Sequence, residues 1–447
     1  MTFLEILGEL TLICVIVFFL ILAVFSLLEN EKRASIRSFV FAGLFVVFNV
    51  MLFIIPLSFR KWTFACAVTI FIVILVYVAL PPKPRRTLQI VSPLKKIDER
   101  DIIFSRFDLI ENSPNYFEYY KRKPENKSKD DEIRKLPDIL APEHVRKSPS
   151  HFNLAAAEFD FLEQQLQSVD GDIHPNQSCS TPRENTINIK NMIHYLGADI
   201  CGVCELDQAF VYSHVGRGPE PYGSEIVLNH AYAVVFAIEM EQKMIAAAPQ
   251  SPVIIETGKK YVEAAKISII AAQHIRKMGY AARAHIAGSN YQAVLPPLGW
   301  KAGLGELGRF GMLITWRFGA RMRLGMLTTD LPLQPDQSVV CGIQDFCEIC
   351  KKCAENCPSQ AISYSGKTEE NGVAKWVLNR ENCYRYWRKV GTDCAVCISV
   401  CPYSKPDNGL HKFIRNFTTW SKRAQSLSLW GDDFFYGRKP KRKPPPF

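Results

Sequence analysis

The sequence predicts an α/β domain that is preceded by three apolar helices and followed by a small cysteine-rich module. The first eighty residues hold three uncharged apolar blocks, and the middle of the chain alternates helix-like and strand-like patterns. Eight of the fourteen cysteines fall within residues 347–401. A chain of 447 residues is long enough for two or three such domains.

The three apolar blocks, residues 10–28, 38–57 and 63–80, are each long enough to cross a bilayer as a helix. The start, MTFLEILGEL, has no basic residue and no twin-arginine pair, which argues against a cleaved export signal. Basic residues concentrate in the first loop and after the third block, which favours a cytoplasmic soluble part. We therefore expect residues 1–80 to form a three-helix, multi-pass anchor in the inner (cytoplasmic) membrane.

The remaining chain divides by composition. Residues 81–150 are rich in Pro, Lys, Glu and Asp, which predicts a polar linker or wrapping segment with little core of its own. Residues 151–340 carry the α/β patterns: KKYVEAAKISIIAAQHIRKMGY predicts a long helix capped at Gly279, and YAVVFAIEM predicts a buried strand. We expect residues 406–437 to pack on this domain and residues 438–447 to be a basic disordered tail.

The cysteine-rich module, residues 341–405, has the spacing of a bacterial two-cluster ferredoxin. CEICKKCAENCP is followed by the shorter run CAVCISVCP, whose missing ligand Cys383 can supply. Because the fourth cysteine of each run serves the other cluster, we expect two interlocked [4Fe–4S] sites. Their ligands would be Cys347, Cys350, Cys353 and Cys401 for one cluster, and Cys383, Cys394, Cys397 and Cys357 for the other. Two zinc sites are the alternative, since zinc also takes four thiolates, but this spacing is more specific than paired CxxC motifs.

Two other motifs are weaker. GLGELG, residues 303–308, fits the GxGxxG pattern of dinucleotide sites, but PPLGWKA precedes it in place of an apolar strand. CGVC, residues 201–204, lies in an apolar strand-like context, where cysteines more often belong to the core.

Several segments together resemble the corrinoid- and iron–sulfur-dependent reductive dehalogenases. They are GYAARAH, AGLGELGRFGMLI, RFGARMRLGMLTTDLPL, FCEICKKCAENCPSQAI, CYRYWRKVGTDCAVCISVCPYS and the closing HKFIRNFTTWSKRAQSLSLWGDDFFYG. The resemblance runs from about residue 150 to 437. Typical members carry a twin-arginine signal and use a separate three-helix anchor protein, so this chain resembles a variant with the anchor built in.

The resemblance implies a nitroreductase-like fold that binds a base-off cobamide, and an enzyme that cleaves a carbon–halogen bond reductively. It also implies that a tyrosine donates the proton, beside a basic residue about sixty positions further along the chain. Arg283 in GYAARAH matches the basic residue and Tyr222 in PEPYGSE is the tyrosine candidate, with Tyr212 and Tyr232 as rivals. A cation next to a phenol favours the phenolate left after proton transfer.

The resemblance also suggests a corrinoid-binding loop, in which glycines let the backbone approach the macrocycle. Its candidate residues are Asn290, Tyr291, Gly303, Gly305, Glu306, Gly308 and Arg309. Arg309 could equally belong to a structural ion pair.

The expected partners are a small organohalide, the lipid bilayer, and an electron donor that is either a membrane quinol or a soluble ferredoxin or flavodoxin. No recognition motif for nucleic acid accompanies the net charge of +10. Two alternative functions are kept: an epoxyqueuosine-reductase-like cobamide enzyme, which would use a carboxylate as its acid, and a membrane-anchored ferredoxin-type electron carrier.

Overall fold

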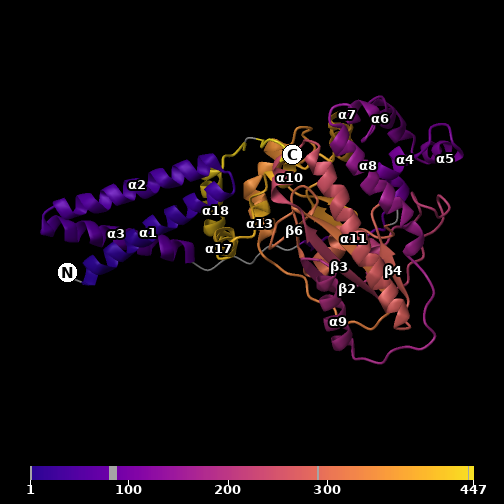
Figure 1. Cartoon of the computed structure of the whole chain (residues 1–447), viewed down its shortest axis with the longest axis horizontal. Helices are drawn as coiled ribbons and strands as arrows, with labels where there is room; N and C mark the ends of the chain where they lie inside the picture. Colours follow the sequence, from indigo (N-terminus) through magenta and orange to yellow (C-terminus); the bar gives the residue numbers. More distant parts are fainter. Residues whose placement is uncertain (1–2, 80–87, 289–290, 441, 447) are drawn as a thin grey trace. The chain divides into compact units, whose positions relative to one another are not determined.

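A computed structural model describes residues 3–79, 88–288, 291–440 and 442–446 of the chain. The chain forms two compact units, Met1–Arg85 with Pro406–Pro440, and Arg86–Lys405 with Lys441–Phe447. The first unit contains α1 (Phe3–Leu28), α2 (Lys32–Ile54), α3 (Leu57–Ala79), α17 (Gly409–Thr418) and α18 (Lys422–Phe435). In this unit α1 packs along both α2 and α3 (Figure 1).

Two of the N-terminal helices are long and apolar enough to cross a membrane. These apolar stretches are Ile6–Leu28 and Lys32–Leu52. In each, only 22% of the most apolar 18 residues are buried. The third apolar block does form a helix, but its described apolar stretch, Lys61–Val73, is shorter than a membrane span. The prediction of three such helices is therefore corrected to two helices that are long and apolar enough, and a three-span anchor is not supported.

The C-terminal helices α17 and α18 form hydrogen bonds with the ends of the N-terminal helices. Glu29, just after α1, accepts hydrogen bonds from Asn408 and lies 3.0 Å from Nε2 of His411. Arg37 of α2 donates to the carbonyl of Phe434, and Arg423 of α18 donates to the carbonyl of Tyr77. Residues 406–437, which we expected on the α/β domain, thus belong to the unit of the apolar helices.

The second unit is built on a four-stranded antiparallel sheet in the order β2-β3-β7-β4. Its strands are β2 (Ile200–Glu205), β3 (Tyr232–Glu239), β7 (Met322–Thr329) and β4 (Ala282–His285); a separate hairpin pairs β5 (Gly305–Leu307) with β6 (Leu313–Thr315). The helices around the sheet are α8 (Pro149–Gln164), α9 (Pro182–Tyr195), α10 (Gln242–Ala246), α11 (Pro252–Lys277) and α12 (Leu295–Lys301). The predicted α/β class is confirmed in this broad sense, with antiparallel strands.

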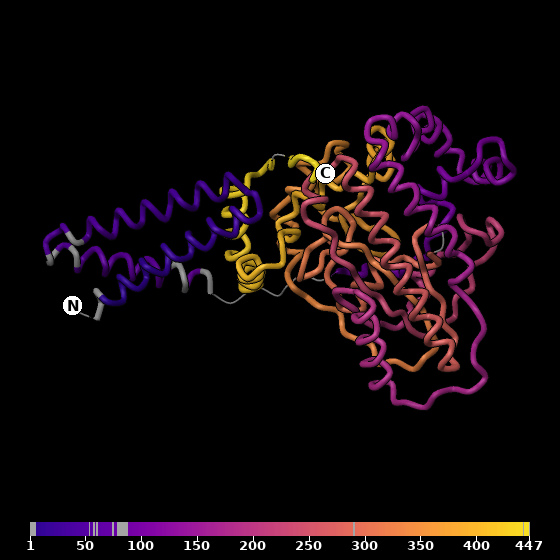
Figure 2. Tube along the Cα trace, viewed as in Figure 1, coloured from indigo at the N-terminus to yellow at the C-terminus, as the bar shows by residue number. Residues whose placement is uncertain are grey.

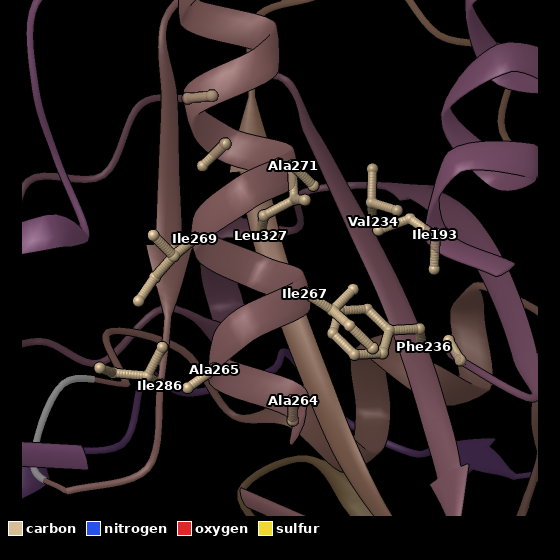
Figure 3. Packing of buried hydrophobic residues seen from close by; sticks show 14 of the residues in the cluster. Ile193, Val234, Phe236, Ala264, Ala265, Ile267, Ile269, Ala271, Ile286 and Leu327 are labelled. Atoms are coloured by element: carbon tan, nitrogen blue, oxygen red, sulfur yellow. The ribbon is translucent and has the colours of Figure 1, made fainter. Parts of the chain in front are cut away.

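Helix α11 and the sheet form the main core because each contributes an apolar face. Alternate residues of β3 point to opposite faces, so Val234 and Phe236 pack with α11 and α9 while Val235 packs on the other face. Figure 3 shows Ile267 of α11 directed toward Phe236. The long helix and its predicted end are confirmed, since Gly279 has φ +87°, a conformation that glycine adopts without strain.

The segment after the apolar helices is folded, which corrects the expectation of little core. It contains α4 (Ile103–Asp108), α5 (Pro114–Arg122), α6 (Pro124–Arg134) and α7 (Pro142–Val145). Its polar composition hides a buried network, in which Asp130 accepts hydrogen bonds from Arg106 and, at 2.9 Å, from the Tyr120 hydroxyl. Arg106 also bonds Glu381 at 2.8 Å, so this segment wraps onto the cysteine-rich module (Figure 2).

The cysteine-rich module consists of short elements separated by tight turns. They are α13 (Ile343–Cys350), α14 (Lys352–Asn356), α15 (Arg380–Val390) and α16 (Val396–Ser399), with β8 (Thr368–Glu370) and β9 (Val373–Lys375) pairing beside β1 (Gln89–Ile90). Lys351 between α13 and α14 and Cys394 and Ala395 before α16 have positive φ. These left-handed turns bend the chain back on itself and bring cysteines from different elements together.

Candidate functional site

The four cysteines of each predicted set are neighbours in space. Burial, and then the neighbouring thiols of Cys353, Cys401 and Cys350, raise the pKa of Cys347. In the same way, the other predicted set forms a second group around Cys397, which also has Cys353 of the first group nearby. The second group consists of Cys357, Cys383, Cys394 and Cys397. The two groups are therefore adjacent, and each takes one cysteine from the other group's sequence run.

Five of these eight thiols are buried, and those of Cys357, Cys383 and Cys397 are partly buried. Burial raises the pKa of Cys353, Cys383 and Cys394 to about 12 each. Among the described residues, no three His, Cys, Asp or Glu side chains surround a point that could hold a single metal ion. A zinc site needs that convergence, whereas an iron–sulfur cubane binds each cysteine at a different iron. The cysteine groups therefore fit clusters better than single ions.

The GLGELGR segment holds the cysteine-rich module in place. One carboxylate oxygen of Glu306 accepts hydrogen bonds from the amides of Cys341 and Ile343, both at 2.9 Å, at the start of α13. Arg309 is 1% exposed, and its guanidinium donates to the carbonyls of Cys347 at 3.1 Å and Ser363 at 2.9 Å. The same guanidinium lies 4.6 Å from the ring centroid of Trp376.

Other parts of the protein occupy the space next to the glycines of this segment. A Cβ on Gly303 would lie 2.6 Å from the carbonyl oxygen of Gln337, and one on Gly305 would lie 2.1 Å from that of Ile314. A Cβ on Gly308 would meet the Ile314 side chain. These glycines allow close packing around the β5–β6 hairpin, and none of these contacts forms an open cradle for a macrocycle or a dinucleotide.

Tyr222 and Arg283 have separate partners. Arg283 of β4 forms ion pairs with Asp170 and, at 2.9 Å, with Glu220. Tyr222 packs against the wrapping segment, in a cluster that includes Tyr116. Burial raises the pKa of Tyr222 to about 12, and the cations that oppose this rise are Arg100 and Arg122.

A different group of polar side chains converges around Tyr291, in the loop after β4. The loop pairs with the segment carrying Tyr212, whose amide donates to the carbonyl of Gln292 at 2.9 Å. Tyr261, Arg323, Arg217 and Tyr212 all influence the ionisation of Tyr291. Burial raises the pKa of Tyr291, and it raises that of Tyr212 to about 12. The predicted Asn290 lies outside the described residues.

Within this group, Tyr261 and Arg323 form a phenol–guanidinium pair that the sequence analysis missed. The guanidinium carbon of Arg323, on β7, lies 5.2 Å from the ring centroid of Tyr261, on α11. The two residues are 62 positions apart, which is the spacing expected from the resemblance. Tyr261 was overlooked because an aromatic residue in an amphipathic helix is usually part of the core. The remaining rival, Tyr232, begins β3 and packs against the main core.

The CGVC motif belongs to the core. Cys201 and Cys204 lie three positions apart on β2 and pack on opposite faces of the sheet. Burial raises the pKa of both thiols to about 12. They therefore share neither a face nor the reactivity of a redox pair.

The chain is similar to several known proteins. Residues 346–405 match the family model of a 4Fe-4S dicluster domain. A tetrachloroethene reductive dehalogenase from Dehalobacter restrictus is 32% identical over 274 residues, which cover 51% of this chain and 49% of that protein. An epoxyqueuosine reductase from Lactococcus garvieae is 32% identical over 113 residues, covering 24% of this chain and 31% of that protein.

The fold agrees with the sequence relationship. A solved catabolic reductive dehalogenase in complex with 3-bromo-4-hydroxybenzoic acid superposes with a TM-score of 0.64 and 25% identity, covering 81% of this chain and 50% of that one. The chain spans about half the length of the curated reductive dehalogenases that it matches. The chain is similar to these reductive dehalogenases over 51–58% of its own length.

Proposed function

We propose that the protein is a reductive dehalogenase that acts on a small organohalide. In this reaction two electrons and one proton enter the substrate, the carbon–halogen bond breaks, and halide leaves. The relationship to enzymes of that name and the dicluster domain support the electron-transfer half of the proposal. The observation that carries the proton-transfer half is the pairing of Tyr261 with Arg323.

Tyr261 is the proposed proton donor and Arg323 the residue that stabilises its phenolate. A phenol gives up its proton more readily when a cation remains beside the resulting anion. Arg323 meets this requirement because it is buried and lies against the ring, where water screens its charge little. Tyr222 and Arg283, the candidates from the sequence, each have other charged neighbours and support this role less well.

The proposed cofactors are two [4Fe–4S] clusters and a cobamide. The two neighbouring cysteine groups would hold the clusters. The cobamide would lie beside Tyr212, Tyr261 and Tyr291, which come from three different segments and are each only partly buried. When bound, it supplies a low-potential cobalt for reducing the organohalide. Glu306 and Arg309 would act from the module boundary, by holding the cluster-binding run.

We further propose that α1 and α2 anchor the protein in a membrane. Their apolar side chains are largely exposed within the first unit, with Leu20 41%, Val24 50% and Leu44 59% exposed. Exposing an apolar surface of that extent to water is unfavourable, whereas exposing it to lipid is not. An electron donor would be a membrane quinol or a soluble ferredoxin or flavodoxin.

Halide release by anaerobically purified, cobamide-reconstituted protein tests the proposal. With a panel of brominated and chlorinated substrates and a low-potential reductant, Tyr261→Phe should lower halide release at least about 100-fold, the range typical of a lost general acid. Tyr222→Phe is the matched control and should stay within about twofold. Tyr222→Phe losing activity while Tyr261→Phe keeps it would reverse the assignment.

The epoxyqueuosine-reductase alternative is tested with the same preparation. That alternative requires a carboxylate acid, whereas the donor proposed here is the phenol of Tyr261. We expect no reduction of epoxyqueuosine-containing tRNA under conditions that release halide. Reduction of that tRNA without halide release would replace the proposal with the alternative. If cobalt-loaded protein shows neither activity, the result would favour an electron carrier.

A further inference from the structure

Three side chains, from α11, from β7 and from the loop before Cys394, form a closed hydrogen-bonded triangle next to the proposed site. Nη2 of Arg323, on β7, donates to Oγ1 of Thr257 at 2.6 Å and also to Oδ2 of Asp393. Oγ1 of Thr257, on α11, donates to the same oxygen of Asp393 at 2.7 Å. The guanidinium is therefore held at one end by a hydroxyl and a carboxylate that also bind each other.

Each of the three residues is close to a residue with a proposed function. Thr257 lies four positions before Tyr261 on α11, so the two residues are on the same side of the helix, one turn apart. Asp393 directly precedes Cys394, a proposed cluster ligand, and its carbonyl accepts a hydrogen bond from the amide of Ala395 at 2.7 Å. Arg323 connects the two, because its guanidinium also contacts the Tyr261 ring.

The charges of the group favour a fixed cation. Burial by itself would lower the pKa of Arg323, but Tyr261 and Asp393 raise it overall, so the guanidinium stays charged inside the protein. A long arginine side chain has many rotamers, and the carboxylate and hydroxyl together select one of them. Without them, the cation would be free to leave the face of the ring.

We propose that Asp393 and Thr257 form a clamp that positions Arg323 against Tyr261, so that the cluster-binding loop itself sets the geometry of the proton donor. Asp393 and Thr257 are positioning residues, since they act through Arg323. The inference rests on the proposed role of Tyr261. One consequence is that assembly of the cluster around Cys394 and completion of the proton-donating pair depend on the same loop.

The clamp is tested by Thr257→Val, which removes the hydroxyl at nearly constant shape, and by Asp393→Asn, which removes the charge. Thr257→Ser keeps the hydroxyl and is the matched rescue variant. Thr329→Val is a second control, because it removes another buried hydroxyl from the strand that carries Arg323. The full chain, with both clusters assembled, is used throughout.

Three readouts are compared. Iron per chain shows whether the clusters assemble, and halide release shows whether the site works. The third readout is independent of activity: Tyr261 is replaced by 3-fluorotyrosine, and its fluorine NMR signal reports the position of the cation next to the ring. We expect Thr257→Val and Asp393→Asn to shift this signal and to lower halide release about tenfold or more with iron unchanged. Thr257→Ser and Thr329→Val should match the parent protein.

An unchanged fluorine signal in both Thr257→Val and Asp393→Asn would overturn the clamp. So would an equal shift in Thr329→Val, which would show a general loss of packing, or a loss of iron in both clamp variants, which would make the residues part of the cluster scaffold. If the parent protein releases no halide, the proposed function fails. The fluorine signal then still decides whether the clamp positions Arg323.

Discussion

Arg309 shows how one buried side chain can join two parts of the molecule. Its guanidinium donates to backbone carbonyls of residues 347, 348, 363 and 365 and lies over Trp376. An arginine suits this task because its five N–H donors are fixed in a plane. The cluster-binding run is thereby attached to the strand hairpin of the α/β domain.

We predict that Arg309→Ala destabilises the protein and its clusters. The substitution leaves buried carbonyls without a donor, at about 1–3 kcal/mol for each one that water does not reach. Iron content and the midpoint of anaerobic thermal unfolding should both fall. Arg309→Lys, the control for charge, should recover only part of the loss because an ammonium cannot span the same carbonyls. Full recovery with lysine would show that charge alone matters.

At this scale the sequence predicted the cysteine ligands, whereas the proposed proton donor was not among its candidates. Cysteine ligands are recognisable because a cluster imposes a fixed spacing along the chain. Tyr261 and Arg323 are brought together by the packing of α11 on β7, and no local pattern records that contact. Tyr222 and Arg283 were chosen from position along the chain, which does not reveal that Arg283 is occupied by Asp170 and Glu220.

Among the helices, the contact between α8 and α11 contains a carboxyl group that titrates near neutrality. A Cβ at Gly258 would lie 2.3 Å from Oε2 of Glu158, so the glycine lets this side chain lie against α11. Burial, and then the nearby charge of Glu256, raise the pKa of Glu158 from 4.5 to about 7. The folded protein therefore holds this proton more tightly than the unfolded chain.

The contribution of Glu158 to stability should consequently fall as the pH rises from about 4.5 to about 7. Glu158→Gln stays neutral at every pH, so its melting temperature should match that of the parent protein near pH 4.5 and exceed it above pH 7. Paired anaerobic melting curves at several pH values measure the difference. A gap that stays constant with pH, or that grows toward acid, would contradict the prediction.

Helices α17 and α18 carry exposed aromatic side chains close to the ends of the apolar helices. Trp430 is 62% exposed and stacks on Phe434 at 5.6 Å, while Arg37 lies 4.5 Å from the centroid of the Phe434 ring. Tryptophan and arginine residues are both typical of the headgroup region of a bilayer. The proposed membrane anchor thus predicts that α18 lies at the membrane surface.

Brominated lipids test this placement, because bromine quenches tryptophan fluorescence at short range. The emission of Trp430 is obtained by subtracting the emission of Trp430→Phe from that of the parent protein. In reconstituted vesicles, lipids brominated near the headgroup should quench this emission more than lipids brominated at the chain end. Trp376→Phe is the control, since Trp376 is 2% exposed in the second unit and should contribute no quenching. Equal emission from Trp430 with and without bromine would place α18 outside the membrane.

Element prediction succeeded where apolar periodicity was strong. The helix over α11 and the strand over β3 were both confirmed, because a buried face repeats every 3.6 or 2 residues. The wrapping segment was underestimated because its buried residues are tyrosines, arginines and aspartates, which composition assigns to the surface. Only their mutual bonds, such as that of Tyr120 with Asp130, make them a core.

For the molecule as a whole, the interlocked cysteine sets predict how iron is lost. Cys401→Ser should remove one cluster and lower iron from about eight to about four per chain. The double variant Cys401→Ser with Cys350→Ser should lose no further iron, because both residues belong to the same set. The double variant Cys401→Ser with Cys397→Ser should lose the remaining iron. Cys341→Ser is the control and should keep about eight. A further loss with Cys350→Ser would show that the sets are divided differently.

The sequence by itself determined that apolar helices precede an α/β domain, and it predicted that eight cysteines form two interlocked groups. These features are local or periodic, since length, apolar repeat and ligand spacing are imposed along the chain. The tertiary structure decided that Arg309 and Glu306 hold the cysteine-rich module, that Tyr261 faces Arg323, and that Thr257 and Asp393 fix that arginine. Such contacts join residues tens of positions apart, and their energy comes from burial and hydrogen bonding, which exist only once the chain has folded.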